Sequence, residues 1–455
     1  MMGPSVIEIP SDSTVNMHNH KAPYAIIAKP IGPLCNLACK YCFYLEKQQL
    51  FQKNSSFRMS YEVLEAFIRQ YITSQDFPEV VFSWQGGEPT ILGVNFFRKV
   101  VELQKRYADG KKISNALQTN GVLLDDEWCE FLTENQFLVG LSIDGPADLH
   151  DCFRVDKHQR PTFDRVMNGV GLLKKHSTQF NTLTVVNDIN SRQALKVYRF
   201  LKEVSEGFMQ FIPLIELKPG KEAKLLGLDL GMPPMSSKET NESAVTEWSV
   251  KPGKFDEFYI QIFDEWIRSD VGKVFVQFFD VALGNWMGLG SGLCVFAPTC
   301  GHASVLEHNG DLYACDHYVY PQYKLGNIQE RSLDALMDSN LQRQFGHNKL
   351  DLLPQDCVGC EVRFACNGEC PKHRFQRTHS GGPQLSYLCS AYKRIFRHMD
   401  PYMKVMARMV SSGNEASLIM DYVADEDRQK RFKTTKRNEP CPCGSGKKSK
   451  KCCGS

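Results

Sequence analysis

The sequence predicts an α/β fold in which a parallel sheet, either open or curled into a partial barrel, precedes a cysteine-rich segment and a short cysteine-rich tail. Two observations predict this organisation. Short apolar runs alternate with helical patterns about six times before residue 215, which requires right-handed crossovers between parallel strands. The 17 cysteines are also clustered, with three between residues 35 and 42, eight between 294 and 389, and four between 441 and 453.

The predicted strands are short apolar runs of ordinary strand length. They cover residues 25–28, 80–84, 114–118, 138–142, 183–186 and 208–212. Apolar residues recur at helical spacing between these runs, as in Val63, Leu64, Phe67 and Ile68, in Phe96, Phe97, Val100 and Leu103, and in Val166, Val170 and Leu173. Strand and helix therefore alternate, as they do in a partial (β/α)6 TIM-like barrel.

The composition changes after the sixth predicted strand. Residues 216–253 are rich in Lys, Gly, Pro, Ser and Glu, which predicts an exposed excursion, and helical spacing returns at 255–276. Residues 290–400 are rich in Cys, Gly and His and poor in long periodic elements. Such a segment buries too little apolar surface to fold alone, so we expect bound metal to supply part of its folding energy.

These patterns divide the chain into six parts. We expect a flexible N-terminus (1–21), a partial barrel (22–253), a bridging helical segment (254–289), a cysteine-rich domain (290–405), a linker (406–438) and a metal-binding tail (439–455).

Composition and charge narrow the class of protein. The chain has 455 residues, of which 42% are hydrophobic, and a formal net charge of +2, as in a soluble globular protein that uses neither nucleic acid nor an anionic membrane as its main partner. The basic stretch from 428 to 451 is the local exception. We find no pattern of a signal peptide or membrane span and expect a cytoplasmic protein. An odd number of cysteines then argues for metal ligands rather than disulfides.

Three cysteines form the first group, Cys35, Cys39 and Cys42, directly after the first predicted strand. Parallel α/β folds place their chemistry at this end of the strands. Three thiolates can ligate three irons of a 4Fe-4S cluster and leave the fourth iron open. A structural zinc site would need a fourth protein ligand, and the nearest histidines are upstream, at His18 and His20.

The Cys-x-x-x-Cys-x-x-Cys spacing, with Tyr41 before the last cysteine, resembles the cluster loop of radical S-adenosylmethionine (SAM) enzymes. The resemblance implies that SAM binds the open iron and is cleaved there to a 5′-deoxyadenosyl radical. It also implies SAM contacts at other positions: the amino group at Gly86, Gly87 and Glu88, the ribose at Ser142 and Asp144, the carboxylate at Arg154 and the adenine at Leu214. A plain turn is the alternative for the first three, which their spacing after the cysteine triplet disfavours, and a surface or turn role is the alternative for the others.

The second group of cysteines resembles the SPASM pattern that follows the barrel in peptide-modifying radical SAM enzymes. The resemblance implies two further 4Fe-4S clusters, so three in all. One would be held by Cys294, Cys300, Cys315 and Cys370, and the other by Cys357, Cys360, Cys366 and Cys389. Two zinc ribbons remain the alternative. Full cysteine ligation leaves no iron for substrate, which favours electron transfer as the role of these clusters.

Residues from about 22 to 405 resemble the anaerobic sulfatase-maturating enzymes, in stretches such as LVGLSIDGP and RFACNGECPKHRF. The resemblance implies oxidation of a cysteine or serine in an unfolded or nascent sulfatase to Cα-formylglycine, with Asp316 as the base and a flavodoxin- or ferredoxin-like reductant. Two alternatives remain: a SPASM enzyme that modifies or crosslinks a ribosomally made peptide, and a non-enzymatic iron–sulfur electron carrier.

The tail resembles the SEC-C motif, a small zinc-binding hairpin, with one zinc held by Cys441, Cys443, Cys452 and Cys453. Its lysines are suited to contact an acidic protein or ribosomal RNA.

Overall fold

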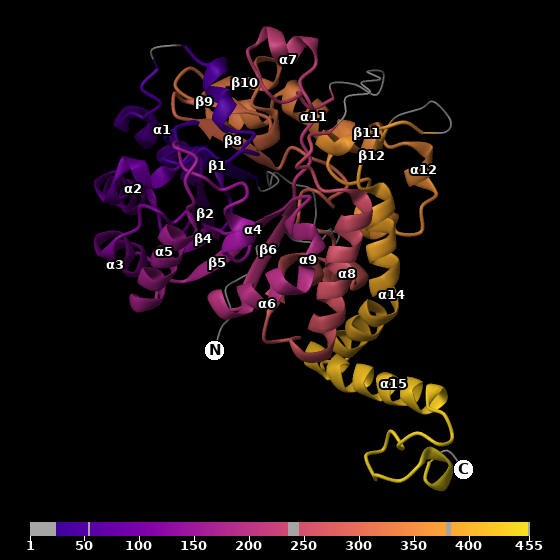
Figure 1. Cartoon of the computed structure of the whole chain (residues 1–455). Coiled ribbons are helices and arrows are strands. Elements are labelled where there is room, and N and C mark those ends of the chain that lie inside the picture. The colour runs from indigo at the N-terminus through magenta and orange to yellow at the C-terminus, as the bar shows by residue number, and fades with distance from the viewer. Residues whose placement is uncertain (1–23, 53–54, 235–244, 379–383, 454–455) are drawn as a thin grey trace.

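The computed structural model describes residues 24–52, 55–234, 245–378 and 384–453. Ten strands form one sheet in the order β10-β9-β8-β1-β2-β3-β4-β5-β6-β7 (Figure 1). Their bounds are β1 (Ala25–Lys29), β2 (Glu79–Trp84), β3 (Lys112–Thr119), β4 (Leu138–Ser142), β5 (Phe180–Val186), β6 (Phe208–Pro213), β7 (Phe275–Val276), β8 (Ala303–Glu307), β9 (Asp311–Tyr313) and β10 (Lys324–Asn327). A separate pair consists of β11 (Arg374–Gln376) and β12 (Leu385–Ser386).

The first six strands pair in parallel and in sequence order, which confirms the predicted α/β fold of alternating strands and helices. The α-helices are α1 (Tyr61–Ser74), α2 (Val94–Tyr107), α3 (Asp126–Glu134), α4 (Ala147–His150), α5 (Phe163–Lys175), α6 (Ala194–Val204), α7 (Lys221–Leu225), α8 (Pro252–Ser269), α9 (Gln277–Trp286), α10 (Leu333–Met337), α11 (Asn340–Asp351), α12 (Gln355–Val358), α13 (Arg363–Cys366), α14 (Cys389–Ser411) and α15 (Ile419–Thr434).

Short 3-10 helices occupy several of the connections. They are η1 (Leu45–Leu50), η2 (Pro89–Leu92), η3 (Asn190–Arg192), η4 (Asp316–Tyr318), η5 (Pro321–Tyr323), η6 (Pro371–His373), η7 (Ala416–Leu418) and η8 (Ser449–Lys451).

Local sequence explains where the barrel helices begin and which face they bury. The side chain of Ser60 accepts a hydrogen bond from the Val63 amide at the start of α1, and Asp125 does the same for Trp128 at the start of α3. The apolar face of α1 packs on the sheet through Phe67, whose ring meets that of Phe82 on β2 edge to face. The helices are therefore fixed on the sheet by buried aromatic contacts.

The sheet does not end at β1. Strand β8 pairs in parallel with β1 along its whole length, from Ala25↔Ala303 to Lys29↔Glu307, and β9 and β10 follow in antiparallel pairing. Residues of the cysteine-rich segment therefore extend the sheet of the barrel. The carboxyl end of β1, where the first cysteine loop begins, consequently lies beside the carboxyl end of β8.

Three helices cover the other end of the molecule. Helices α8, α9 and α14 pack against one another beside β6 (Figure 1). Helix α14 was not predicted from the sequence, although its buried face follows a helical period, at Ala391, Tyr392, Ile395, Phe396, Met399, Met403, Met406 and Ala407. Among the helices that the structure describes, none combines the length and apolar character needed to cross a membrane.

The start of α15 is packed against the body of the molecule. Ile419 and Val423 are buried. Asp427 forms an ion pair with Arg268 of α8, with 2.9 Å between the Arg268 Nε and the Asp427 Oδ2. The later part of α15 and the cysteine tail extend away from the body (Figure 1).

Candidate functional site

The first cysteine loop lies between β1 and η1, and backbone contacts hold it against the Gly86–Gly87–Glu88 turn. The amide of Gly87 donates to the carbonyl of Gly32 at 2.7 Å, and that of Glu88 donates to Leu34 at 2.9 Å. A Cβ atom on Gly87 would lie 1.9 Å from the Leu34 carbonyl oxygen, so no other residue fits there without movement. The structure therefore brings together two of the motifs that the sequence predicted to share a site.

The three thiols of this loop are free and are largely withdrawn from water. Burial raises the pKa of Cys35, raises that of Cys39 to about 12, and raises that of Cys42. The charges of Cys39 and Cys42 raise the pKa of Cys35 further. Buried, clustered thiols that resist ionisation are poor isolated nucleophiles, but they fit a metal centre, whose positive charge would replace their protons.

Glu88 is almost completely buried, and the protein itself binds its carboxylate. One oxygen accepts from the Thr90 amide and hydroxyl and from the Thr119 hydroxyl at 2.7 Å, and the other accepts from the Asn120 amide at 2.8 Å. Burial raises the pKa of Glu88, and these donors oppose the rise. The Asn120 side chain also approaches Cys35, at 3.8 Å from the sulfur. Thr119 and Asn120 were not predicted, although they belong to the sequence TNG that ends β3.

A second buried group links Tyr41 to the end of β4. The Tyr41 hydroxyl donates to Asp144 at 2.5 Å, and Arg154 forms an ion pair with the same carboxylate oxygen at 3.0 Å. The other oxygen accepts from the Val185 amide at 3.0 Å. Burial raises the pKa of Cys39, and the charge of Arg154 lowers it. The structure thus places Asp144 and Arg154 beside the first cysteine loop.

The two remaining predicted SAM contacts lie at strand ends. Ser142 is the last residue of β4, and Leu214 follows β6, with its amide donating to the Val186 carbonyl at 2.9 Å. Both are buried. Their roles toward SAM stay predictions.

Asp316 begins η4, one residue after Cys315. Its carboxylate lies 2.5 Å from the ammonium of Lys29, the last residue of β1. Burial is the largest single cause and raises the pKa of Asp316, but the charge and hydrogen bond of Lys29, together with His317 and Lys372, hold the pKa below its ordinary value. Asp316 is therefore ionised at neutral pH, as a general base must be.

His317 next to Asp316 stays uncharged. Burial lowers the pKa of His317 to about 3, and the nearby charge of Lys372 lowers it further. Lys372 itself is paired with Glu216 at 2.6 Å, which joins η6 to the segment after β6. The ring of His317 packs on Phe43 of the first cysteine loop, with centroids 5.3 Å apart.

The first set of predicted auxiliary ligands comes from three separate connections, with Cys294 and Cys300 between α9 and β8, Cys315 after β9 and Cys370 before η6. Burial is the main cause that raises the pKa of Cys300, Cys315 and Cys370, and each of these pKa values is raised further by Cys294. Cys294 therefore influences the charge of each of the other three thiols. Lys349, buried on α11, holds the loop by donating to the carbonyls of Cys294 and Val295, at 2.7 and 2.9 Å.

The second predicted set is also gathered, at the N-terminal end of α14. Burial raises the pKa of Cys357 to about 11 and that of Cys366 to about 12, and Cys389 raises both further. Cys360 acts in the same way on Cys389.

The turn between Cys366 and Cys370, two of the predicted metal ligands, has a compact backbone that Arg374 holds by hydrogen bonds. Its residues 367–369 all have positive φ, and the Arg374 guanidinium donates to three of its carbonyls, those of Asn367, Gly368 and Glu369. Lys349 and Arg374 were not predicted, because a distant cation that binds backbone oxygens leaves no spacing pattern in the sequence.

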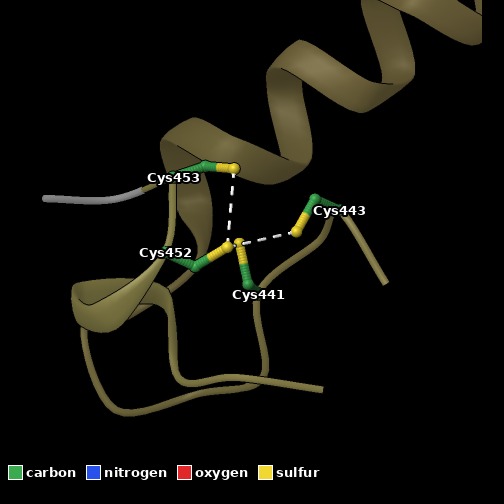
Figure 2. Close-up of side chains that lie close together, drawn as sticks. All are labelled: Cys441, Cys443, Cys452 and Cys453. Carbon is green, nitrogen blue, oxygen red and sulfur yellow. Dashed lines mark hydrogen bonds between the residues drawn. The ribbon is translucent and has the colours of Figure 1, made fainter. Parts of the chain in front are cut away.

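The tail brings its four cysteines together. The sulfurs of Cys441, Cys443, Cys452 and Cys453 all lie within 4.8 Å of one another (Figure 2). Bonds from Ser445 lower the pKa of Cys443 to about 6, which favours the thiolate. Four thiols at this separation fit one tetrahedral ion, and among the described residues no other His, Cys, Asp and Glu ligand atoms are grouped so closely.

Three parts of the chain match known families. Residues 30–201 match the radical SAM superfamily, residues 294–361 match the SPASM iron-sulfur cluster-binding domain, and residues 437–455 match the SEC-C motif.

Comparison with individual proteins extends over most of the chain. It is 47% identical to the serine-type anaerobic sulfatase-maturating enzyme of Bacteroides thetaiotaomicron, over 89% of this chain and 96% of that one. It is 33% identical to the cysteine-type enzyme of Clostridium perfringens, over 83% of this chain and 97% of that one. Among solved structures, native anSMEcpe with bound AdoMet and Cp18Cys peptide matches with a TM-score of 0.73 and 32% identity, over 85% of this chain and 99% of that one.

Proposed function

The chain belongs to the anaerobic sulfatase-maturating enzymes of the radical SAM superfamily, and from this membership we propose that it oxidises one cysteine or serine side chain of a sulfatase polypeptide to Cα-formylglycine. The placement of Asp316 carries the proposal. This carboxylate pairs with Lys29, the last residue of β1, and directly follows Cys315 of the first auxiliary set. A base at this place can take a proton from a substrate side chain held near it.

Three cysteines of the first loop, Cys35, Cys39 and Cys42, would hold the 4Fe-4S cluster. When bound there, SAM and the reduced cluster supply an organic radical that removes a hydrogen atom from Cβ of the substrate residue. Around this position, Tyr41, Gly86, Gly87, Glu88, Ser142, Asp144, Arg154 and Leu214 would fix SAM, either by contact or by supporting the loop. The buried Tyr41–Asp144–Arg154 group supports this arrangement because it holds the middle of the cysteine loop rigidly.

Asp316 would take the proton from the thiol or hydroxyl of the same substrate residue. Loss of a hydrogen atom and a proton leaves one further electron to be removed before the carbon becomes an aldehyde or thioaldehyde. The two auxiliary sets, with four cysteines each, would hold clusters that accept this electron. With a cysteine substrate, water would then hydrolyse the thioaldehyde to the aldehyde and release hydrogen sulfide.

We propose also that the tail holds one zinc ion, and that a flavodoxin- or ferredoxin-like protein supplies the reducing electron. The close grouping of Cys441, Cys443, Cys452 and Cys453 supports the zinc proposal.

The function is tested by anaerobic incubation of the reconstituted protein with SAM, a reductant and synthetic peptides that carry the sulfatase motif with cysteine or with serine. We expect mass spectrometry to show loss of two hydrogens from serine, or exchange of the thiol for an aldehyde oxygen on cysteine. The product should react with a hydrazide reagent. A product of lower mass that resists the hydrazide would be a crosslink and would contradict the proposal.

The matched controls are the single replacements of Cys35, Cys39 or Cys42 by Ala. Each should abolish SAM cleavage, because three ligands are the fewest that hold the cluster with one open iron. Full SAM cleavage by any of them would show that the first cysteine loop has another role, and SAM cleavage by the wild-type protein excludes a simple electron carrier.

A further inference from the structure

Lys29 touches both loops that meet at the site. It is 2% exposed, and its ammonium lies 2.5 Å from a carboxylate oxygen of Asp316. The same ammonium lies 3.9 Å from the centre of the Tyr44 ring. Tyr44 belongs to the first cysteine loop, and Asp316 to the loop of the auxiliary ligand Cys315. One buried cation therefore connects the two loops.

The pairing of β1 with β8 fixes the position of Lys29. Lys29 on β1 and Glu307 on β8 are register partners in the parallel ladder, and Glu307 is fully buried. The Tyr44 hydroxyl donates a hydrogen bond to the Glu307 carboxylate. Strand pairing thus holds Glu307, Glu307 holds Tyr44, and the ring of Tyr44 supports the ammonium of Lys29.

The other buried lysines of this region have different partners. Lys372 pairs with Glu216 at 2.6 Å, and Lys47 lies over the ring of Tyr320 at 3.5 Å. Among the described residues, Lys29 is the one cation in ion-pair contact with Asp316. The carboxylate therefore depends on a single partner for its orientation.

We propose that Lys29 is a positioning residue. It holds the Asp316 carboxylate at a fixed position relative to the first cysteine loop, so that the proton and the hydrogen atom are removed from the same substrate side chain. The inference rests on the proposed function. Lys29 acts only through Asp316, because its ammonium is already in contact with the Asp316 carboxylate and the Tyr44 ring. Without it the carboxylate can rotate, and radical formation should continue while substrate oxidation fails.

The first test compares Lys29→Met and Lys29→Arg in the full, reconstituted chain. We expect Lys29→Met to lower the ratio of aldehyde formed to SAM cleaved by about ten- to a hundred-fold. Lys29→Arg, which keeps the charge, should recover a large part of that ratio. Peptide affinity, measured by fluorescence anisotropy, and the cluster absorption spectrum should both match the wild type. Lys47→Met, at a buried lysine that does not pair with Asp316, is the matched control and should keep the ratio.

An unchanged ratio in Lys29→Met would overturn the inference. So would a loss of iron or SAM cleavage that parallels the loss of aldehyde, because this pattern means a general structural role. If the wild-type protein cleaves SAM but forms no aldehyde, the proposed function fails instead, and the two failures are thereby distinguished.

A second test needs no catalytic activity. The melting temperatures of Lys29→Met, Asp316→Asn and the double variant form a double-mutant cycle on the reconstituted protein. A positioning contact predicts that the double variant melts no lower than the worse single variant, because the second substitution removes a partner that is already lost. Additive losses would show that the two side chains do not depend on each other, and would overturn the inference even where Lys29→Met proves too unstable to assay.

Discussion

At the scale of single residues, the site is a set of buried charges that are each matched. Asp316 pairs with Lys29, Asp144 pairs with Arg154, and the Glu88 carboxylate accepts hydrogen bonds from neutral donors. A buried charge without a partner is costly, so each pair constrains the position of both members.

Replacing Asp316 by Asn removes the proposed base and keeps the shape of the side chain. We expect SAM cleavage to persist and aldehyde formation per SAM cleaved to fall about 100-fold or more, the usual contribution of a general base. Chromatography of 5′-deoxyadenosine and mass spectrometry of the peptide measure the two quantities. Equal losses of both would place Asp316 outside proton transfer.

Among the described glycines, Gly87 is the one at which an added Cβ atom would come closest to another atom. Gly87→Ala places a Cβ atom on the Leu34 carbonyl, so we expect the free energy of unfolding to fall by about 3 kcal/mol and iron binding to weaken. Denaturant unfolding and iron analysis test this. Gly171→Ala, on the exposed face of α5 with no atom near the new Cβ, is the matched control and should be neutral or stabilising by up to about 1 kcal/mol. A Gly87→Ala protein as stable as this control would contradict the close approach.

The sequence predicted the cysteines at this scale but not the residues that support them. Cysteine spacing within a loop reports directly on a shared metal, so the triplet and the grouping of the eight later cysteines were visible. Lys29, Asn120 and Lys349 act across distances of many residues in the sequence and on backbone or carboxylate groups. Their types are common, and only the fold shows what they touch.

At the scale of helices and strands, the six parallel strands were found within a few residues of their predicted bounds. They are buried on at least one face and therefore read as apolar runs. Strands β7, β9 and β10 were missed because they have only two to four residues each, too few for a pattern. Strand β8, with five residues, was missed because it lies in the segment whose cysteines and glycines suggested irregular structure. Helix α14 was missed because it lies in a segment whose cysteines and glycines suggested irregular structure, although its apolar face is helical in period.

Helix α9 carries a carboxyl group that should make stability depend on pH. Burial raises the pKa of Asp280 to about 7, and within the described part of the chain no hydrogen bond or ion pair reaches its carboxyl group. The folded protein thus keeps this proton at pH values where the unfolded chain has lost it. The free energy of unfolding should therefore fall as pH rises from about 4 to about 7.

Asp280→Asn removes this titration. We expect it to raise the free energy of unfolding by about 1–3 kcal/mol at pH 8 and to leave stability at pH 4 unchanged. Denaturant titrations at the two pH values measure the difference. Asp76→Asn, at an exposed carboxyl group, is the control and should change neither value. A gain of equal size at both pH values would mean that packing, not charge, is responsible.

At the scale of the whole molecule, charge is unevenly distributed. Of the 54 Lys and Arg and the 52 Asp and Glu, ten cations and one acid lie between residues 428 and 455, so the rest of the chain has 44 cations and 51 acids. All ten cations of this C-terminal stretch, residues 428–455, are exposed. The C-terminal stretch is thus basic, whereas the rest of the chain is acidic. The two charges nearly cancel, which explains why the small net charge of the chain gave no indication of partners.

The tail should be separable from catalysis. Ending the chain after Thr435, at the end of α15, should remove one zinc per chain and leave SAM cleavage and peptide oxidation unchanged, because the contacts of α15 with α8 lie earlier, at residues such as Asp427. Elemental analysis and the peptide assay test this. Zinc content that survives the truncation would place the metal elsewhere, and lost oxidation would give the tail a role in substrate capture.

The parallel pairing of β1 with β8 has a consequence for synthesis of the chain. Strand β1 leaves the ribosome well before its partner β8, which begins at residue 303. Until then one side of β1 has open backbone groups, and such an edge pairs readily with other chains. The emerging polypeptide would need protection by a chaperone through most of translation, and expression of a fragment that stops before β8 should yield aggregates rather than a smaller working enzyme.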